Sequence, residues 1–229
     1  MINKDYKLTV LTLLCLVVWM GGLAIPIAQA KLKTAKRKEY EIKAAFIYNI
    51  LKFIDYPKNS EEVQEAGKEK SDKSAKVFTI GFVADKEVYE ACKAIRGKKI
   101  KGKIIQTVLF DSLTEKDLKQ GDKSKKVKAL KGCEVLFICV RQESKSTQAD
   151  YRQILMALKG INILTIGERD GFIEPVKPKD PCGIINFVIE GKKVRFEINL
   201  DKAQECGFEI KAQLLKLAKR IIKKAKPKK

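Results

Sequence analysis

Four short apolar runs constrain the fold most strongly. Each has the length of a β-strand and is rich in β-branched residues: "VFTIGFVA" (77–84), "KIIQTVLF" (103–110), "CEVLFICV" (133–140) and "INILTIGE" (161–168). Between them, "DKEVYEACKAI" (85–95) and "STQADYRQILMALKG" (146–160) repeat their apolar residues at helical intervals. Because the runs do not alternate apolar and polar residues, they are typical of parallel strands covered on both faces.

The end of the chain follows a different pattern. "GIINFVIEGKKVRFEINL" (183–200) predicts two antiparallel strands joined by a turn at Glu190-Gly191-Lys192. The residues after 200 are predicted to be helical to the end, with a break at Gly207. We therefore predict a single three-layer α/β domain of Rossmann-like type over 39–222, with helices on both faces. Its mostly parallel sheet is finished by the antiparallel hairpin, and a basic tail (223–229) follows.

Residues 1–30 have the pattern of a signal peptide. Lys4 and Lys7 precede a nearly unbroken apolar run over 8–23, and Ala28-Gln29-Ala30 supplies the small residues of a cleavage site. We expect cleavage after Ala30, a solvated leader over 31–38 and a periplasmic location. The alternative is an uncleaved inner-membrane anchor facing the periplasm, because the apolar stretch is just long enough to span a bilayer.

The formal net charge of +20 indicates either an anionic partner or a solvated lysine-rich surface. The lysines are spread along the chain without an RNA-binding aromatic motif or a zinc-ligand pattern, so we expect no nucleic-acid partner. Among the basic stretches, the tail "KRIIKKAKPKK" is interpreted as the one concentrated cluster. It is a candidate for weak contact with an anionic membrane surface, and a frayed terminus is the alternative.

Several kinds of chemistry are excluded by composition and motifs. The chain contains no histidine, which rules out histidine-dependent triads, histidine metal ligands and histidine acid–base catalysis. No G-x-G-x-x-G, P-loop or G-x-S-x-G motif follows a predicted strand. We therefore expect no catalytic residues, no cofactor, no metal site and no enzymatic activity.

Five cysteines lie beyond the signal sequence, so at least one thiol is left unpaired: Cys92, Cys133, Cys139, Cys182 and Cys206. Cys92 lies on a predicted helix and Cys133 opens a predicted strand, and a helix that covers the sheet could bring them within bridging distance. Cys139, in an apolar strand, is interpreted as a buried thiol. Cys182 and Cys206 could pair or remain free.

The first helical segment, "EYEIKAAFIYNILKFIDYP" (39–57), has more apolar surface than a surface helix needs. One stripe holds Ile42, Phe46, Asn49 and Phe53. We expect its two phenylalanines to pack on the sheet and Asn49 to hydrogen-bond a loop or strand-end group there.

The neighbouring flank of the same segment is our candidate for a docking or dimer surface. It is predicted to be exposed and consists of Lys43, Ile47, Ile50 and Ile54, beside Tyr56. Ordinary packing under a neighbouring helix is the alternative. At the hairpin, Arg195, Glu197 and Asn199 are candidates for supporting a site, and cross-strand pairing is their alternative.

Four blocks in order resemble the YfiR family of periplasmic regulatory proteins over about 39–219: the first helical segment, "CEVLFICV", "ILTIGERDGF" and "GIINFVIEGKKVRFEINLDKAQECGFEIKAQLLKLA". The resemblance implies a Rossmann-like fold, export and no enzymatic activity. It implies a repressor that binds the periplasmic sensory domain of a membrane-bound diguanylate cyclase and so controls cyclic di-GMP and biofilm formation. It also implies a homodimer.

The resemblance also bears on single residues. Cys92 and Cys133 resemble the positions of a family disulfide. The chain departs from the family at Tyr56-Pro57, where tryptophan-proline is usual, and at Cys182, where no cysteine is expected. The close cysteine pair that some members carry near "ILTIGERDGF" is absent, and members also accompany sensors other than cyclases.

Two functions follow as hypotheses. The first is an exported, non-enzymatic regulatory protein that binds and inhibits the periplasmic sensory domain of a membrane-bound signalling protein, which the resemblance indicates to be a diguanylate cyclase. The alternative is a periplasmic small-ligand-binding protein for sensing or uptake. A concave pocket with convergent polar groups at the strand ends would favour the alternative, whereas a flat apolar helix face would favour the first.

Processing can be tested by fluorescence, because Trp19 is the only tryptophan of the chain. Protein purified from the periplasm should show no tryptophan emission, since cleavage after Ala30 removes Trp19. A clear tryptophan signal from purified native protein would contradict cleavage.

Overall fold

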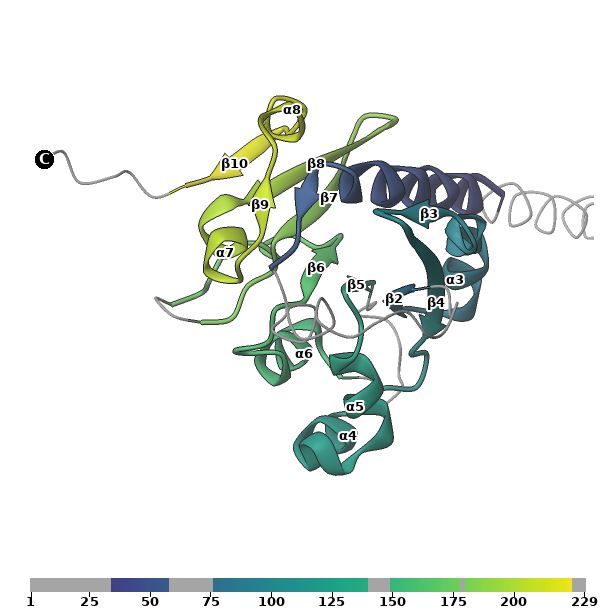
Figure 1. Cartoon of the computed structure of the whole chain (residues 1–229), viewed down its shortest axis with the longest axis vertical. Coiled ribbons are helices and arrows are strands. Elements are labelled where there is room, and N and C mark those ends of the chain that lie inside the picture. Colours follow the sequence, from purple (N-terminus) through teal and green to yellow (C-terminus); the bar gives the residue numbers. More distant parts are fainter. Residues whose placement is uncertain (1–33, 58–75, 140–148, 178–179, 224–229) are drawn as a thin grey trace, which may run out of the picture.

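The computed structural model describes residues 34–57, 76–139, 149–177 and 180–223 (Figure 1). Within these ranges eight strands form one sheet in the order β10-β8-β7-β6-β5-β2-β4-β3, and β1 pairs with β9 separately. The strands are β1 (Ile54–Asp55), β2 (Val77–Val83), β3 (Lys99–Ile100), β4 (Lys103–Leu109), β5 (Val135–Ile138), β6 (Leu164–Gly167), β7 (Ile185–Glu190), β8 (Lys193–Asn199), β9 (Glu209–Ile210) and β10 (Arg220–Ile222).

The helices include one long element over 34–51, called the long helix below. The others are α3 (Lys86–Cys92), α4 (Glu115–Gln120), α5 (Lys125–Lys131), α6 (Tyr151–Ala157), α7 (Leu200–Glu205) and α8 (Ala212–Leu215), with 3-10 turns at Lys93–Ile95 and Gly121–Lys123. Among the helices of the described ranges, none has the length and apolarity needed to cross a bilayer. The predicted signal peptide, most of the tail (224–229) and part of the leader lie outside these ranges.

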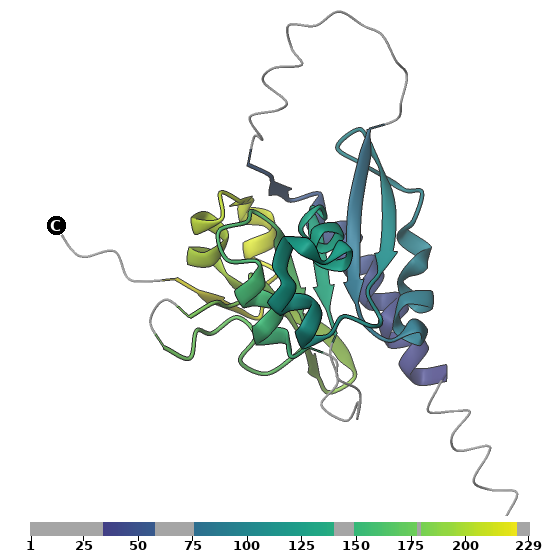
Figure 2. The same ribbon diagram turned by 90° about the horizontal axis from the view of Figure 1, so that it is seen from below.

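The predicted fold class is confirmed. Strands β4, β2, β5, β6 and β7 run parallel to one another. At the two sides of this group, β3 is antiparallel to β4, and β8 returns antiparallel to β7 with Glu190 opposite Lys193. Two apolar cores lie on the two faces of the sheet. The long helix, α3 and α7 cover one face, whereas α5 and α6 cover the other (Figures 1 and 2).

The prediction of helix after residue 200 is right only in part. α7 is helical and the chain breaks at Gly207 as predicted, but it then forms β9 against β1, the short helix α8 and β10, parallel to β8. Tertiary pairing overrides the helical pattern there, because both short strands satisfy their backbone groups on strands distant in sequence. Residues 224–229 lie outside the described ranges.

The face that the long helix buries is the reverse of the predicted one. Ile47, Ile50 and Ile54 of the supposed exposed flank are each no more than 1% exposed. In the supposed core stripe, Ile42 is 48% exposed and Asn49 is exposed, whereas Phe46 and Phe53 pack partly buried against the core. The fully buried face of the helix repeats at helical intervals and has a small residue that allows close packing: Tyr40, Ala44, Ile47 and Leu51.

Asn49 and Tyr56 also differ from expectation, whereas Phe46 agrees with it. Among the described residues, Asn49 bonds no strand-end group and instead accepts a hydrogen bond from Lys52 Nζ at 3.0 Å. Phe46 packs on the sheet as expected: it is half-buried, with its ring 6.2 Å from the ring centroids of both Phe187 and Phe196 of the hairpin. The ring of Tyr56 is wedged between aromatic neighbours, Phe78 and Phe208. The predicted docking flank is therefore core, with Lys43 buried beside it.

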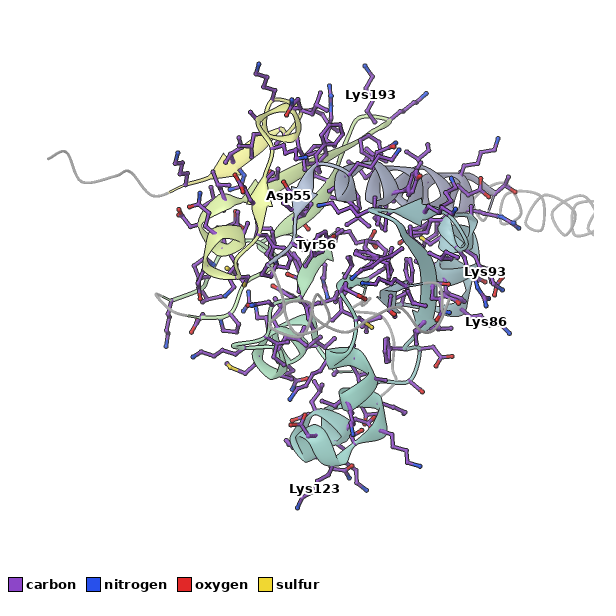
Figure 3. All side chains as sticks on the ribbon, in the orientation of Figure 1. Asp55, Tyr56, Lys86, Lys93, Lys123 and Lys193 are labelled. Carbon is purple, nitrogen blue, oxygen red and sulfur yellow. The ribbon has the colours of Figure 1, made fainter. Side chains whose placement is uncertain are left out.

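Lysine side chains project outward around the molecule, as the labelled Lys86, Lys93, Lys123 and Lys193 show (Figure 3). Most surface ion pairs here join exposed side chains, such as Lys93 with Glu90 at 3.2 Å and Lys119 with Glu115 at 2.8 Å. Pairs of this kind contribute little to stability. Much of the positive charge is therefore a solvated surface.

The buried face of the long helix can be tested with two equivalent truncations. Ile47→Ala should lower the free energy of unfolding by about 2–5 kcal/mol, because it leaves a cavity in the core. Ile42→Ala, on the outward face of the same helix, should change it by less than about 0.5 kcal/mol. Urea unfolding measures both. Equal effects would contradict the assigned face.

Candidate functional site

Polar side chains gather where β5 and β6 end. Cys139 directly follows β5, and Glu168 directly follows β6. The chain runs from β2 to β4 on one side and then to β5 on the other, so the strand order reverses between β2 and β5. In open α/β sheets ligands bind outside the carboxyl ends of the strands at this reversal. Cys139, at the end of β5, therefore borders this reversal, and Glu168 ends the next strand.

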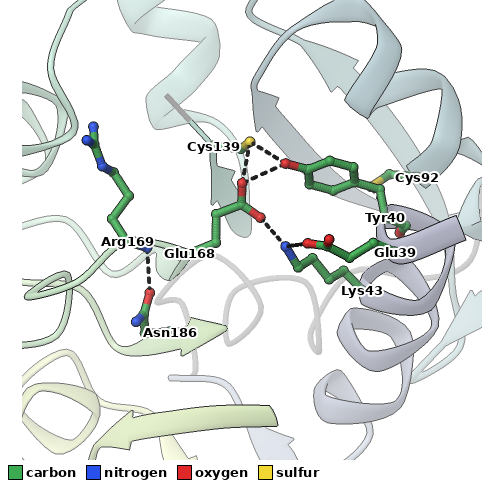
Figure 4. Close-up of polar contacts among 8 residues, drawn as sticks. All are labelled: Glu39, Tyr40, Lys43, Cys92, Cys139, Glu168, Arg169 and Asn186. Carbon is green, nitrogen blue, oxygen red and sulfur yellow. Dashed lines mark hydrogen bonds and ion pairs between the residues drawn. The ribbon is translucent and has the colours of Figure 1, made fainter. Parts of the chain in front are cut away.

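Glu168 is the centre of the cluster (Figure 4). Its Oε1 accepts hydrogen bonds from Tyr40 Oη at 2.8 Å and from Cys139 Sγ at 2.7 Å. Its Oε2 accepts one from Lys43 Nζ at 2.6 Å. The Lys43 side chain is 4% exposed and that of Glu168 is 14% exposed, and Lys43 also pairs with Glu39. One carboxylate therefore joins two residues of the long helix to two strand ends.

The pKa shifts in this cluster fix the protonation state of its members. Burial, with the nearby Cys139 and Glu168, raises the pKa of Tyr40. Burial and the Glu168 charge likewise raise the pKa of Cys139. Burial lowers the pKa of Lys43, but the charge and hydrogen bond of Glu168 outweigh it and the net pKa is raised. At neutral pH the cluster holds a phenol, a thiol and an ammonium group, all donating.

Two neighbours complete the surroundings shown in Figure 4. Cys92 Sγ donates to the backbone oxygen of Tyr40 at 3.7 Å, and burial raises the pKa of Cys92 to about 12. The Arg169 backbone N–H donates to Asn186 Oδ1 at 3.0 Å. The pKa values of Cys92 and Cys139 are both raised, whereas a reactive cysteine has a lowered pKa.

The cluster is suited to fixing the long helix in place. Each donor has an oxygen partner, and each Glu168 oxygen accepts at least one hydrogen bond. In the described part of the chain, no group of three or more cysteine, aspartate or glutamate residues is placed to hold a metal ion. The arrangement therefore ties the long helix to the ends of β5 and β6. We call this group, Tyr40, Lys43, Cys139 and Glu168, the lock.

Two hollows lie outside the cluster. A groove of about 410 Å³ runs between the start of the long helix and α3, with Lys36, Arg37, Tyr40 and Lys86 among its lining residues. A larger cavity of about 530 Å³ lies between α6 and α7, away from the β5–β6 end. Its lining combines apolar and polar side chains: Leu155, Leu158, Thr165, Asn199 and Lys202.

The structure does not form the Cys92–Cys133 disulfide. Both thiols are free, as are Cys139, Cys182 and Cys206. Cys92 belongs to the core beneath the long helix, whereas Cys133 belongs to the core beneath α5 and α6. The sheet separates the two thiols, so a bridge would need strand rearrangement. The burial predicted for Cys139 is confirmed, at 3% exposed.

The hairpin candidates are not brought together as a site. Arg195 is exposed and lies 3.5 Å from Glu190. Glu197 accepts two hydrogen bonds from Arg220 of β10, at 3.0 and 2.8 Å. Asn199 caps α7 by accepting from the Lys202 backbone N–H at 2.8 Å. Each of these contacts joins secondary-structure elements.

Sequence reasoning did not identify Tyr40, Cys139 and Glu168 as one group. A usable signal existed, because Cys139 and Glu168 each end an apolar run. Since the carboxyl ends of parallel strands meet at one edge of the sheet, the pair could have been placed together. The contribution of Tyr40 and Lys43 depends on where the long helix lies, which the sequence did not show.

The fold and the site define a single α/β domain whose strand ends are closed by a buried polar lock. A family profile described as YfiR/HmsC-like matches residues 40–219, and the chain belongs to this family. Membership supports a periplasmic regulatory role in the control of cyclic di-GMP. The family's proteins are regulators, and they interact with the periplasmic sensor domain of a diguanylate cyclase.

No curated protein matches the chain. A solved structure from Streptococcus pneumonia, described as an ABC domain in complex with L-Trp, is 16% identical with a TM-score of 0.44, covering 63% of this chain and 55% of its own. A conserved domain protein from Vibrio cholerae is 12% identical with a TM-score of 0.42, covering 62% and 54%. The chain thus spans about half the length of either structure.

The lock can be tested by neutralising its central carboxylate. Glu168→Gln should lower the free energy of unfolding by about 2–3 kcal/mol, because the buried Lys43 ammonium keeps only Glu39. Glu39→Gln is the matched control, and its effect should stay below about 1 kcal/mol because Glu39 is 37% exposed. Equal losses in the two variants would contradict a central role for Glu168.

The same pair predicts a pH dependence. Since the folded pKa of Lys43 is raised above 10.5, its contribution is complete below that pH and is lost as the pH rises through the folded pKa. The stability difference between wild type and Glu168→Gln should therefore be constant near neutral pH and narrow above pH 10.5. Urea unfolding across this range measures it.

Proposed function

We propose that this protein is a non-enzymatic regulator that binds and inhibits the periplasmic sensory domain of a membrane-bound diguanylate cyclase. The observation that carries the proposal is the family match, which spans nearly the whole domain. The site agrees with this role, because its thiols and phenol are kept protonated and its carboxylate is occupied by internal donors.

Inhibition of this kind is a shift in a conformational equilibrium. The regulator must bind the inactive state of the sensor more tightly than the active state, since equal affinity shifts nothing. Moving a sensor from mostly active to mostly inactive takes a difference in affinity of about 10⁴-fold. A rigid surface favours such discrimination, because less freedom is lost on binding.

The outward stripe of the long helix is the surface we assign to the sensor. It holds Ile42, Ala45, Phe46 and Asn49 and lies beside the β7–β8 hairpin through the contacts of Phe46. Tyr40 and Lys43, on the opposite side of the same helix, fix it to the sheet through Glu168. The stripe is thus a fixed surface with an apolar centre, as protein interfaces often have.

A second candidate function is supported by the cavity of about 530 Å³, which has the size and mixed lining of a small-molecule site. Under this alternative the protein binds a small periplasmic ligand for sensing or uptake.

Homodimer formation is a separate prediction, and light scattering on the purified protein tests it.

The assigned surface predicts the effect of a paired substitution. Ile42→Asp with Ala45→Asp should weaken capture of the sensor about tenfold or more, because it places charge at the apolar centre of the interface. Cyclic di-GMP should rise in the same cells. Crosslinking in intact cells, followed by identification of the captured membrane protein, measures the loss.

The control carries the same charge change elsewhere. Met156→Asp with Val176→Asp alters two side chains that are 55% and 61% exposed, outside the long helix and the hairpin. This variant should capture the sensor normally. Unchanged capture by the stripe variant, or equal loss in both, would overturn the assignment of the surface.

A further inference from the structure

A second cluster of positive charge lies at the far end of the long helix, apart from the tail. The segment "RGKKIKGK" (96–103) contains five cations and no carboxylate. It leads into β3 and β4, and β3 forms one edge of the main sheet. Arg96, Lys98 and Lys99 are all exposed. The folded chain therefore presents a row of cations along an open sheet edge.

Tyr48 of the long helix holds two of the cations together. Lys52 Nζ lies 4.1 Å and Lys98 Nζ lies 4.9 Å from the centroid of the Tyr48 ring. Tyr48 Oη also donates to the backbone oxygen of Lys99 at 3.2 Å. The ring attracts each ammonium group, which keeps both cations near this end of the long helix.

Internal carboxylates do not neutralise this group. The nearby acid is Asp55, which is labelled in Figure 3. Its carboxylate already lies 2.7 Å from Lys101 and 3.7 Å from Lys211. Within the described residues, Arg96, Lys98, Lys99 and Lys52 form no ion pair with a carboxylate. Their charge is available to an external partner.

The same edge also carries an aromatic ring. Tyr48 is half-buried beside Lys52 and Lys98. Cations mixed with an amphipathic ring are typical of surfaces that rest at a lipid headgroup layer.

We propose that this surface, the lysine edge (Arg96, Lys98, Lys99 and Lys52 with Tyr48), binds the anionic phospholipid headgroups of a bilayer. Charge complementarity selects this partner, since juxtamembrane cations each add to the attraction of an anionic leaflet. The tail was the cluster expected from the sequence, and most of it (224–229) lies outside the described residues.

Lipid contact would also orient the protein. Lys52 follows the last turn of the long helix, whose outward stripe is assigned to the sensor, so the bilayer would set the distance of that stripe from the membrane. This consequence rests on the proposed function, whereas lipid binding itself does not. A test without any sensor keeps the two separable.

The experiment is co-sedimentation of the purified protein with vesicles. Wild type should bind vesicles of mixed phosphatidylglycerol and phosphatidylcholine, bind phosphatidylcholine alone much more weakly, and lose binding as salt rises. Lys98→Glu with Lys99→Glu should weaken binding about tenfold or more. Lys192→Glu with Lys193→Glu, the same charge change at the other hairpin, should weaken it less than about threefold.

Two further variants separate lipid binding by the edge from self-association and from binding by the tail. Lysines on an edge strand also prevent edge-to-edge association. Lys52→Gln lies on the helix, and it should weaken vesicle binding about threefold while the protein stays as wild type in light scattering. Truncation after Lys223 should leave most of the binding intact. Equal losses in both lysine pairs, loss only on truncation, or no preference for anionic vesicles would each overturn the proposal.

Discussion

The hydrogen-bonded carboxylate of Glu168 is the interaction on which the arrangement of this molecule depends. It stands at the end of β6 and accepts from Tyr40, Lys43 and Cys139, which belong to the long helix and to the end of β5. An unpaired Lys43 ammonium in this place would be strongly unfavourable, because its side chain is almost fully buried. The helix is therefore held with one rotational setting, and its opposite face is fixed as the outward one.

Both proposed surfaces follow from that setting. The outward stripe around Ile42 lies opposite the locked face, and the Tyr48 ring with its two ammonium groups lies further along the same helix. A regulator that must distinguish two states of a sensor benefits from such rigidity. The chain belongs to the YfiR/HmsC-like family, and this membership supports a periplasmic regulatory role in the control of cyclic di-GMP.

The sequence predicted the parallel sheet and the hairpin well, because apolar runs without alternation leave few other arrangements. The sequence did not predict which face of the long helix is buried, because two of its faces are similarly apolar. The stripes headed by Ile42 and by Ile47 have similar composition, so periodicity could not say which one packs against the sheet. The Cys92–Cys133 pairing failed for a related reason, since position along the chain does not show which face of a sheet a side chain occupies.

By itself the sequence determined the fold class, the order of the six longer strands along the chain and the chemistry that a chain without histidine excludes, since these depend on local pattern and composition. The tertiary structure alone decided which residues meet. It placed Tyr40 beside Glu168, separated by 128 positions, and brought Lys52 and Lys98 to one ring. It also turned the end of the chain into strands, because short segments take the structure that distant partners complete by hydrogen bonding.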